Sequence, residues 1–216
     1  MKTGTFYYME EVRSKISIEN ELKRKLIHLS SSVIAITYLF VDRQLMLIMI
    51  GALLIISLAM DLMRYYSVDF NRLYLRFLKP ILRLHELSSK GVVLTGATYL
   101  LLAAFISILI FPGEIAVMAI LVMTVCDTSA ALVGKYFDKS KIAAKTLEGS
   151  LAFFISGLIV IFVTPKMTES NYEYLIAIAA LFLTTLVELI PFKIDDNIII
   201  PVFFGLVYLI SVNIFL

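Results

Sequence analysis

An acidic residue deep in an apolar segment is the first feature of this sequence that needs a chemical explanation. Asp127 lies within the apolar run 114–134, and its neighbours are small or hydroxylated: Thr124, Thr128, Ser129, Ala130, Ala131 and Gly134. A carboxylate at such a depth in a membrane helix is costly and by default marks a functional site. Small neighbours let a second helix or a ligand come close. We therefore expect Asp127 to be functional.

A second segment has the composition of an anion site. Lys145, Thr146, Glu148, Gly149 and Ser150 stand where the lysine-rich loop 135–146 meets the start of a predicted helix. Free N–H groups at a helix start carry partial positive charge and bind phosphate, and a glycine permits close approach. Carboxylates beside such a site would repel phosphate unless a divalent cation bridged the two. The alternative is that this loop is only a solvated basic loop.

The start of the first apolar run carries a third polar group. Glu21, Arg24, Lys25 and His28 precede or enter this run, and Arg24 and His28 share one helical face with Ser31 and Ser32. Such a face could supply cations and a proton acceptor. Two simpler alternatives stay open. Arg24 and Lys25 could only set the membrane topology, and His28 could hydrogen-bond a neighbouring helix.

The remaining ionisable residues stand at the ends of other apolar runs. Asp61 closes the second predicted helix, and Arg64 follows it three residues later. Glu188 lies near the end of the sixth run, and Asp195, Asp196 and Asn197 open the seventh predicted helix. Each also has a purely structural interpretation. Asp61 and Arg64 could form an i,i+3 pair, one of the two aspartates could cap a helix, and Glu188 could pair with a loop lysine.

The elements that must position these groups are apolar helices. Hydrophobic residues make up 60% of the 216 residues and charged residues 17%, whereas a soluble domain has about 25% charged residues. Apolar runs cover 26–41, 44–60, 92–112, 114–134, 147–164, 172–190 and 197–216. We predict an all-α, multi-pass integral membrane protein with about seven transmembrane helices. The net charge of +2 gives no reason to expect nucleic acid, and the single cysteine, Cys126, excludes an intrachain disulfide.

The basic residues predict the orientation of these helices. Of the 19 Lys and Arg residues, only Arg43 and Lys166 fall on one side of the predicted membrane. The positive-inside rule then places the N-terminus in the cytoplasm and the C-terminus outside. Residues 1–20 are polar and lack the apolar core of a removable signal peptide. We treat residues 1–216 as a single integral membrane domain with a polar cytoplasmic N-terminal segment.

This orientation places every ionisable residue that we consider for the site at the cytoplasmic end of its helix; Arg43 and Lys166 lie on the opposite side. A transporter needs polar groups through the thickness of the membrane. One cytoplasm-facing layer is better suited to an enzyme that takes a soluble reagent from the cytosol and a lipid from the bilayer. The predicted active site therefore lies on the cytoplasmic side.

The loop 61–91 contains an amphipathic segment, 67–88. Arg72, Arg76, Lys79 and Arg83 fall on one face of a helix, and apolar residues cover much of the remainder. Such a helix tends to lie in the membrane interface with its cations against anionic headgroups. The alternative is that these arginines only enforce topology. Pro80 is expected to kink the helix or to split it into two short pieces.

Five short motifs follow one another along the chain. They are Arg24-Lys25-x-x-His28, Asp61-x-x-Arg64, Asp127-Thr128-Ser129-Ala130 with Gly134-Lys135, Lys145-Thr146-x-x-Gly149-Ser150, and Glu188 followed by Asp195-Asp196-Asn197 and Pro201. In this order they resemble the motifs of the CTP-dependent lipid kinases. These enzymes include diacylglycerol, dolichol and phytol kinases, and they are related to the phosphatidate cytidylyltransferases. The resemblance runs from about residue 21 to the end of the chain.

The resemblance implies CTP as donor, a lipid alcohol as acceptor and the following residue roles. Asp127, His28 and Glu188 would be catalytic, and Asp127, Glu148 and Asp196 would bind the cofactor, Mg²⁺. Substrate or nucleotide would be bound by Arg24, Lys25, Lys135, Lys145, Thr146, Gly149, Ser150, Asp61, Arg64 and Asn197.

Two other functions stay open at this point. A cytidylyltransferase would transfer CMP to a lipid phosphate, but residues 191–197 lack the His-Gly-Gly signature of that branch. A non-enzymatic lipid transporter is the second alternative. The sequence names neither the lipid nor the oligomeric state.

Overall fold

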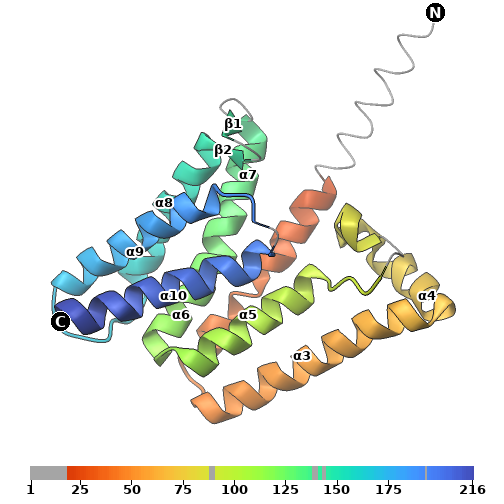
Figure 1. Cartoon of the computed structure of the whole chain (residues 1–216), viewed down its shortest axis with the longest axis horizontal. Coiled ribbons are helices and arrows are strands. Elements are labelled where there is room, and N and C mark those ends of the chain that lie inside the picture. Colours follow the sequence, from red (N-terminus) through yellow and green to blue (C-terminus); the bar gives the residue numbers. More distant parts are fainter. Residues whose placement is uncertain (1–18, 88–90, 138–140, 143–144, 193) are drawn as a thin grey trace, which may run out of the picture.

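The computed structural model is mostly helical and describes residues 19–87, 91–137, 141–142, 145–192 and 194–216 (Figure 1). Residues 19–30 are helical, and α2 follows after a turn at Ser31 and Ser32. The longer helices are α3 (Arg43–Tyr66), α5 (Gly96–Ile110), α8 (Leu147–Val163), α9 (Tyr172–Glu188) and α10 (Asp196–Phe215). Shorter elements are α2 (Val33–Tyr38), α4 (Val68–Leu78) and the 3₁₀ turns η1 (Lys79–Ile81) and η2 (Leu84–Leu87).

One helical rod runs through the centre of the bundle. It consists of α6 (Gly113–Leu121), the π-helical turn η3 (Val122–Cys126) and α7 (Asp127–Phe137). Every residue from Ile115 to Ile120 is buried. Helices α2, α5, α8 and α10 contact this rod, whereas α3 lies at the edge and packs mainly on α5 (Figure 1). The rod therefore carries Asp127 into the interior of the protein.

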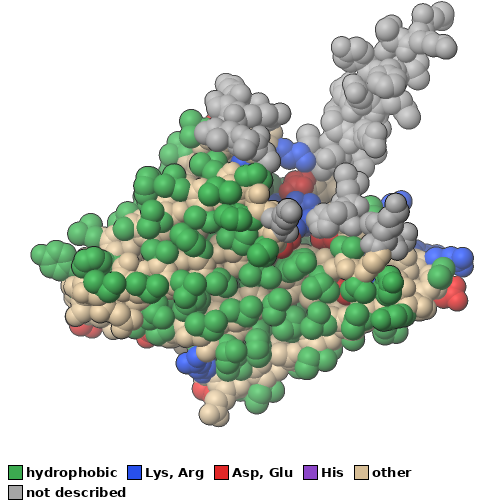
Figure 2. Space-filling model, viewed as in Figure 1, with side chains coloured by type: hydrophobic (Ala, Val, Ile, Leu, Met, Phe, Trp, Pro, Cys, Tyr) green, Lys and Arg blue, Asp and Glu red, His purple; other side chains and the backbone are tan. Residues whose placement is uncertain are grey.

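The prediction of an all-α fold is confirmed, and each predicted apolar run coincides with helical structure. Three helical stretches are long and apolar enough to cross a membrane, namely Arg43–Tyr66, Gly113–Phe137 and Asp196–Phe215. Helices α5 and α8 are apolar but shorter. Hydrophobic side chains cover most of the face in Figure 2, and charged side chains gather in a hollow near its upper edge. These features describe an integral membrane protein, and the count of seven crossings stays a prediction.

Polar side chains fix where several helices begin. The Asp42 carboxylate accepts hydrogen bonds from the backbone N–H groups of Gln44 and Leu45 at the start of α3, at 2.8 and 3.1 Å. Asp195 caps α10 by accepting from the N–H of Asn197 at 3.0 Å. The expectation that one of the two neighbouring aspartates serves as a cap is confirmed.

The predicted amphipathic segment 67–88 is α-helical only in its first half, and its second half contains the 3₁₀ turns η1 and η2. Helix α4 has no buried residue, and Pro80 lies in η1 directly after it. The expected break at the proline is confirmed. Placing Arg83 on the same face as Arg72 was wrong, because the helix ends at Leu78 and the chain then turns Arg83 toward the protein, where it pairs with Asp195.

Candidate active site

Asp127, the first residue of α7, meets two residues of the first helical segment. Its Oδ2 atom lies 2.5 Å from the Lys25 ammonium nitrogen and 3.5 Å from His28 Nε2. All three side chains are at most 15% exposed. Of the predicted face, His28 lies near the carboxylate but Arg24 does not, because Arg24 pairs with Glu21. The cation that reaches Asp127 is Lys25, 102 residues away in the sequence.

The π-helical turn η3 shapes the contact between these two helices. A π turn shifts the backbone register, and such turns are frequent at functional sites. His28 Nε2 lies 3.1 Å from the Met123 carbonyl oxygen in this turn, and Ser32 shares a hydrogen bond with Thr124 at 2.8 Å. Because a carbonyl oxygen only accepts, Nε2 carries the proton. Nδ1 is then the basic nitrogen of the His28 ring.

Lys145 is the centre of a second charged cluster. Its ammonium nitrogen lies 2.8 Å from Glu188 Oε1 and 3.0 Å from Asp196 Oδ2, and Ser150 donates a hydrogen bond to Glu188 Oε2 at 3.2 Å. The possible pairing of Glu188 with a loop lysine is confirmed. Burial lowers the pKa of Lys145, but the two carboxylates outweigh burial and hold this pKa above its ordinary value. Lys145 is thus a permanent cation and not a base.

These two clusters border one cavity of about 270 Å³, which we call the polar pocket. It is lined by Asp127, Ala130, Ala131, Gly134, Lys135, Lys145, Thr146, Gly149, Ser150 and Glu188. The short antiparallel strands β1 (Lys141–Ile142) and β2 (Lys145–Thr146) lead the chain into α8 at this point. Most of the residues that the sequence predicts for phosphate binding therefore meet in one place.

Gly149 has a different neighbourhood from the one we expected. Its N–H group donates to the Thr146 hydroxyl at 3.2 Å. A Cβ atom on Gly149 would lie only 2.8 Å from the Ala130 carbonyl oxygen, and one on Gly134 only 2.5 Å from Thr146 Oγ1. The lack of side chains at these two positions lets α7 and α8 pack closely, and the Gly149 N–H is already used by the helix cap.

A larger cavity of about 420 Å³ lies on the other side of Asp127, and we call it the apolar pocket. Its walls are mainly Ile, Leu, Val and Ala side chains from residues 27–34, α3, α5 and the segment 81–82. Its polar lining comprises Arg24, Lys25, His28, Ser30, Ser31, Tyr74, Arg83, Glu86, Thr95, Asp127 and Asn197. Asp127 and its partner Lys25 therefore stand where the two cavities meet.

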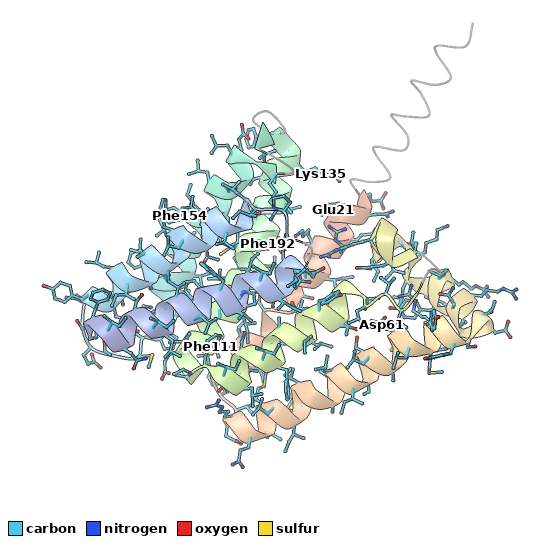
Figure 3. The ribbon with its side chains drawn as sticks, in the orientation of Figure 1. Glu21, Asp61, Phe111, Lys135, Phe154 and Phe192 are labelled. Carbon is cyan, nitrogen blue, oxygen red and sulfur yellow. The ribbon has the colours of Figure 1, made fainter. Side chains whose placement is uncertain are left out.

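The cations of the apolar pocket already have carboxylate partners. Arg24 lies 2.5 Å from Glu21 and Lys25 lies 2.5 Å from Asp127, while Arg83 pairs closely with Asp195. Figure 3 shows Glu21 and Lys135 at the same end of the bundle, far from Phe111 at the other end. An anionic group entering the apolar pocket would thus have to displace an existing ion pair.

Asp61 and Arg64 lie away from the polar pocket and hold helices together. Asp61 Oδ2 accepts hydrogen bonds from Thr95 N–H at 2.8 Å, Thr95 Oγ1 at 3.1 Å and Thr98 Oγ1 at 2.6 Å. Arg64 lies 3.6 Å from Asp61 and donates to the Glu86 carbonyl at 2.7 Å. This network joins α3, α5 and η2. The contact between Asp61 and Arg64 is the i,i+3 pair that the sequence analysis left open. Neither residue lines the polar or the apolar pocket.

The residues present suit a Mg²⁺ ion that is completed by a ligand. Among the described residues, no three His, Cys, Asp or Glu side chains are grouped to hold a metal. Mg²⁺ commonly takes only one or two carboxylates and fills its other positions with phosphate oxygens and water. Asp127 and Glu188 both line the polar pocket and would each offer a carboxylate to such an ion, in exchange for contacts with Lys25 and Lys145. Asp196 contacts the pocket through Lys145, and Glu148 is not in its lining.

Two polar residues of the apolar pocket, Arg83 and Glu86, were missed as site residues. Arg83 was counted only as part of a basic face, and Glu86 had no motif around it. Glu86 accepts from the N–H of Gly96 at 3.0 Å and from the N–H of Arg83 at 3.0 Å. The only signal in the sequence was an acidic residue within a segment otherwise rich in cations.

Comparisons with known proteins give three relatives. The chain is 31% identical over 156 residues to CTP-dependent diacylglycerol kinase 1 of Schizosaccharomyces pombe, covering 66% of this chain and 70% of that protein. It is 29% identical over 197 residues to an uncharacterised protein of Rickettsia prowazekii, covering 90% and 94%. A third relative, from Methanocaldococcus jannaschii, is 29% identical over 184 residues, covering 84% and 88%. No family model and no solved structure matches the chain.

Proposed function

This chain belongs to the family of CTP-dependent lipid kinases, and from that premise we propose that it transfers the γ-phosphate of CTP to the hydroxyl group of a lipid alcohol. The acceptors that suit the proposal are diacylglycerol and polyprenol- or phytol-like alcohols. One observation carries it: a single carboxylate, Asp127, lies in the wall of both a polar and an apolar pocket. A phosphate donor in the first pocket and a lipid in the second would meet beside this residue.

The polar pocket would bind the nucleotide phosphates. Lys145 and Lys135 would supply positive charge there, and Lys145 would exchange a carboxylate partner for a phosphate oxygen. When bound, Mg²⁺ neutralises charge on the transferring phosphoryl group. Asp127 and Glu188 would hold it, with Asp196 next to them across Lys145. In phosphoryl transfer the protein mainly positions groups and compensates charge, and this cluster has the residues for both tasks.

His28 would accept the proton of the lipid hydroxyl. It lines the apolar pocket, and its Nε2–H is directed at the Met123 carbonyl oxygen and toward Asp127. This arrangement leaves Nδ1 as the basic nitrogen and fixes the plane of the ring. A base held by a second acceptor group is a recurrent arrangement for proton transfer.

The charge of the apolar pocket favours a kinase over a cytidylyltransferase. A cytidylyltransferase would bind a lipid phosphate as its acceptor. Among the residues the structure describes, the cations Arg24, Lys25 and Arg83 in this pocket are each paired with a carboxylate. An uncharged hydroxyl can enter without breaking these pairs, whereas a lipid phosphate would compete with the carboxylates.

The proposal includes a membrane topology. Seven crossings with a cytoplasmic N-terminus and an outer C-terminus place both pockets at the cytoplasmic end, where CTP is available. The distribution of Lys and Arg supports this topology, as does the position of Glu21 and Lys135 at the same end of the bundle (Figure 3).

The experiment that tests the function uses purified protein in lipid nanodiscs that contain a lipid alcohol. CTP is labelled at either the α- or the γ-phosphorus. We expect the lipid to become labelled by γ-labelled CTP and not by α-labelled CTP. Label from α-labelled CTP alone would establish cytidylyl transfer instead, and label from neither would leave a non-enzymatic protein such as a lipid transporter.

A further inference from the structure

Arg83 is a wall residue of the apolar pocket to which the proposed reaction gives no task. It follows η1 in the segment between α4 and α5, and it lines the pocket together with His28 and Asn197. Its side chain is 27% exposed, whereas that of its partner Asp195 is 6% exposed. Part of the guanidinium is therefore accessible to a molecule in the pocket.

Two carboxylates hold the guanidinium of Arg83 in place. Nη1 donates a close hydrogen bond to Asp195 Oδ2, and Nε lies 3.8 Å from Glu86 Oε1. Glu86 is itself fixed, because it accepts from the N–H groups of Arg83 and Gly96. Burial lowers the pKa of Arg83, but Asp195 and Glu86 outweigh burial and hold this pKa above its ordinary value. Arg83 is thus a permanently charged and oriented donor.

The other terminal nitrogen of Arg83 is the one that a ligand can use. Among the residues that the structure describes, the hydrogen bonds of Arg83 run from Nη1 to Asp195 and from the backbone N–H to Glu86, and neither uses Nη2. A guanidinium presents five N–H donors in a planar fork, so fixing Nη1 and Nε also fixes the direction of Nη2. Because the charge is already balanced by Asp195 and Glu86, the suitable partner for Nη2 is an uncharged oxygen.

We propose that Arg83 positions the lipid acceptor by donating from Nη2 to a carbonyl oxygen next to the reacting hydroxyl, and that it thereby makes the enzyme prefer an acylglycerol. An acylglycerol has an ester carbonyl within a few bonds of its free hydroxyl. A polyprenol or a phytol-like alcohol has no oxygen apart from the hydroxyl and would leave Nη2 unused. This inference rests on the proposed function and assigns Arg83 as a positioning residue.

The discrimination should be measurable because hydrogen bonds to charged groups are stronger than neutral ones. A site built to bind a polar group rejects an analogue that lacks it. For a partly exposed guanidinium we expect a preference of about 10- to 100-fold. To isolate the contribution of the carbonyl group, the two lipids compared must carry the same glycerol hydroxyl.

The test compares two acceptors that differ only in these carbonyls. A diacylglycerol and a dialkylglycerol of equal chain length are offered to the full chain in nanodiscs with γ-labelled CTP. For the wild type, kcat/KM should be about 10- to 100-fold higher for the ester lipid. Arg83→Lys keeps a cation beside Asp195 but loses the second donor. This variant should bring the ester-to-ether ratio close to one, mainly by lowering kcat/KM for the ester, with little change in KM for CTP.

The control variant is Arg72→Lys, whose side chain is 78% exposed on α4, and it should keep the wild-type ratio. A wild-type ratio near one would overturn the inference and leave the proposed kinase intact. So would an Arg83→Lys variant that loses activity equally on both lipids, because that result would make Arg83 merely structural. If no lipid takes up label from CTP, the proposed function itself fails, and this inference fails with it.

Discussion

Gly149 lies where two helices cross with little space between them. A Cβ atom at this position would come within 2.8 Å of the Ala130 carbonyl oxygen and 3.0 Å of Thr146 Oγ1. Backbone atoms cannot move aside as a flexible side chain can. The residue is therefore needed for helix packing, whether or not a phosphate also approaches it.

The substitution Gly149→Ala should destabilise the protein by about 1–3 kcal/mol, as overpacking of a well-packed interior does. Thermal inactivation in detergent measures the effect. Gly113→Ala is the control, because a Cβ there would meet its nearest atom at 3.9 Å, and it should change the inactivation temperature little. Equal stability of the two variants would show that α7 and α8 can separate at no cost.

Asp127 could be predicted from the sequence, but its partners could not. A carboxylate among apolar and small residues is conspicuous in any hydropathy profile. Nothing in the local pattern shows that Lys25 and His28 provide its neutralisation, because this contact depends on how two distant helices cross. The hydrogen bond between His28 and the Met123 carbonyl oxygen depends on a π turn. The amino-acid sequence gives no sign of such a turn.

At the scale of elements, one network connects the edge helix α3 to the bundle. The Asp61 carboxylate is 1% exposed and receives three hydrogen bonds from Thr95 and Thr98 at the start of α5. Arg64 extends the network to η2. The network sets the distance between α3, α5 and the segment that carries Arg83.

Removing Asp61 should therefore affect stability more than nucleotide use. Asp61→Ala leaves the buried Arg64 guanidinium without its carboxylate, and breaking a buried pair costs about 3–5 kcal/mol. The temperature of thermal inactivation should fall strongly, while KM for CTP in the remaining folded protein should stay near the wild-type value. Asp69→Ala removes the exposed pair with Arg72 and should have little effect on either quantity. If Asp61→Ala instead raised KM for CTP and left stability unchanged, Asp61 would have to be assigned to the nucleotide site.

The main elements followed from simple sequence rules, but several details did not. The apolar runs, a cap at Asp195 or Asp196 and the break at Pro80 were predicted, whereas the Asp42 cap of α3 and the turn at Ser31 and Ser32 were not. The direction of Arg83 was not, because residues beyond a proline break no longer follow the helical period that precedes it. The polar and apolar pockets were also invisible, since each is lined by residues from several helices.

For the whole molecule, the proposed topology makes a prediction about surface labelling. Tyr136 is 84% exposed at the end of α7, and Glu169 lies exposed between α8 and α9. In sealed cells, Glu169→Cys should react with a membrane-impermeant thiol reagent, and Tyr136→Cys should react only after permeabilisation. The native Cys126 is buried and provides the unlabelled background. Reaction of both variants in sealed cells would rule out seven crossings and the single cytoplasmic layer of charged residues.

The central claim for the molecule is that phosphate passes from the polar to the apolar pocket beside Asp127. The most direct measurement is the transfer of label from γ-labelled CTP to lipid by Asp127→Asn, in parallel with its thermal stability. Asparagine keeps the size of the side chain and one oxygen but loses the charge that would hold Mg²⁺. The variant should fold, yet transfer label at least about 10²-fold more slowly, as expected when electrostatic stabilisation is removed. A folded variant that transfers label at nearly the wild-type rate would contradict the claim.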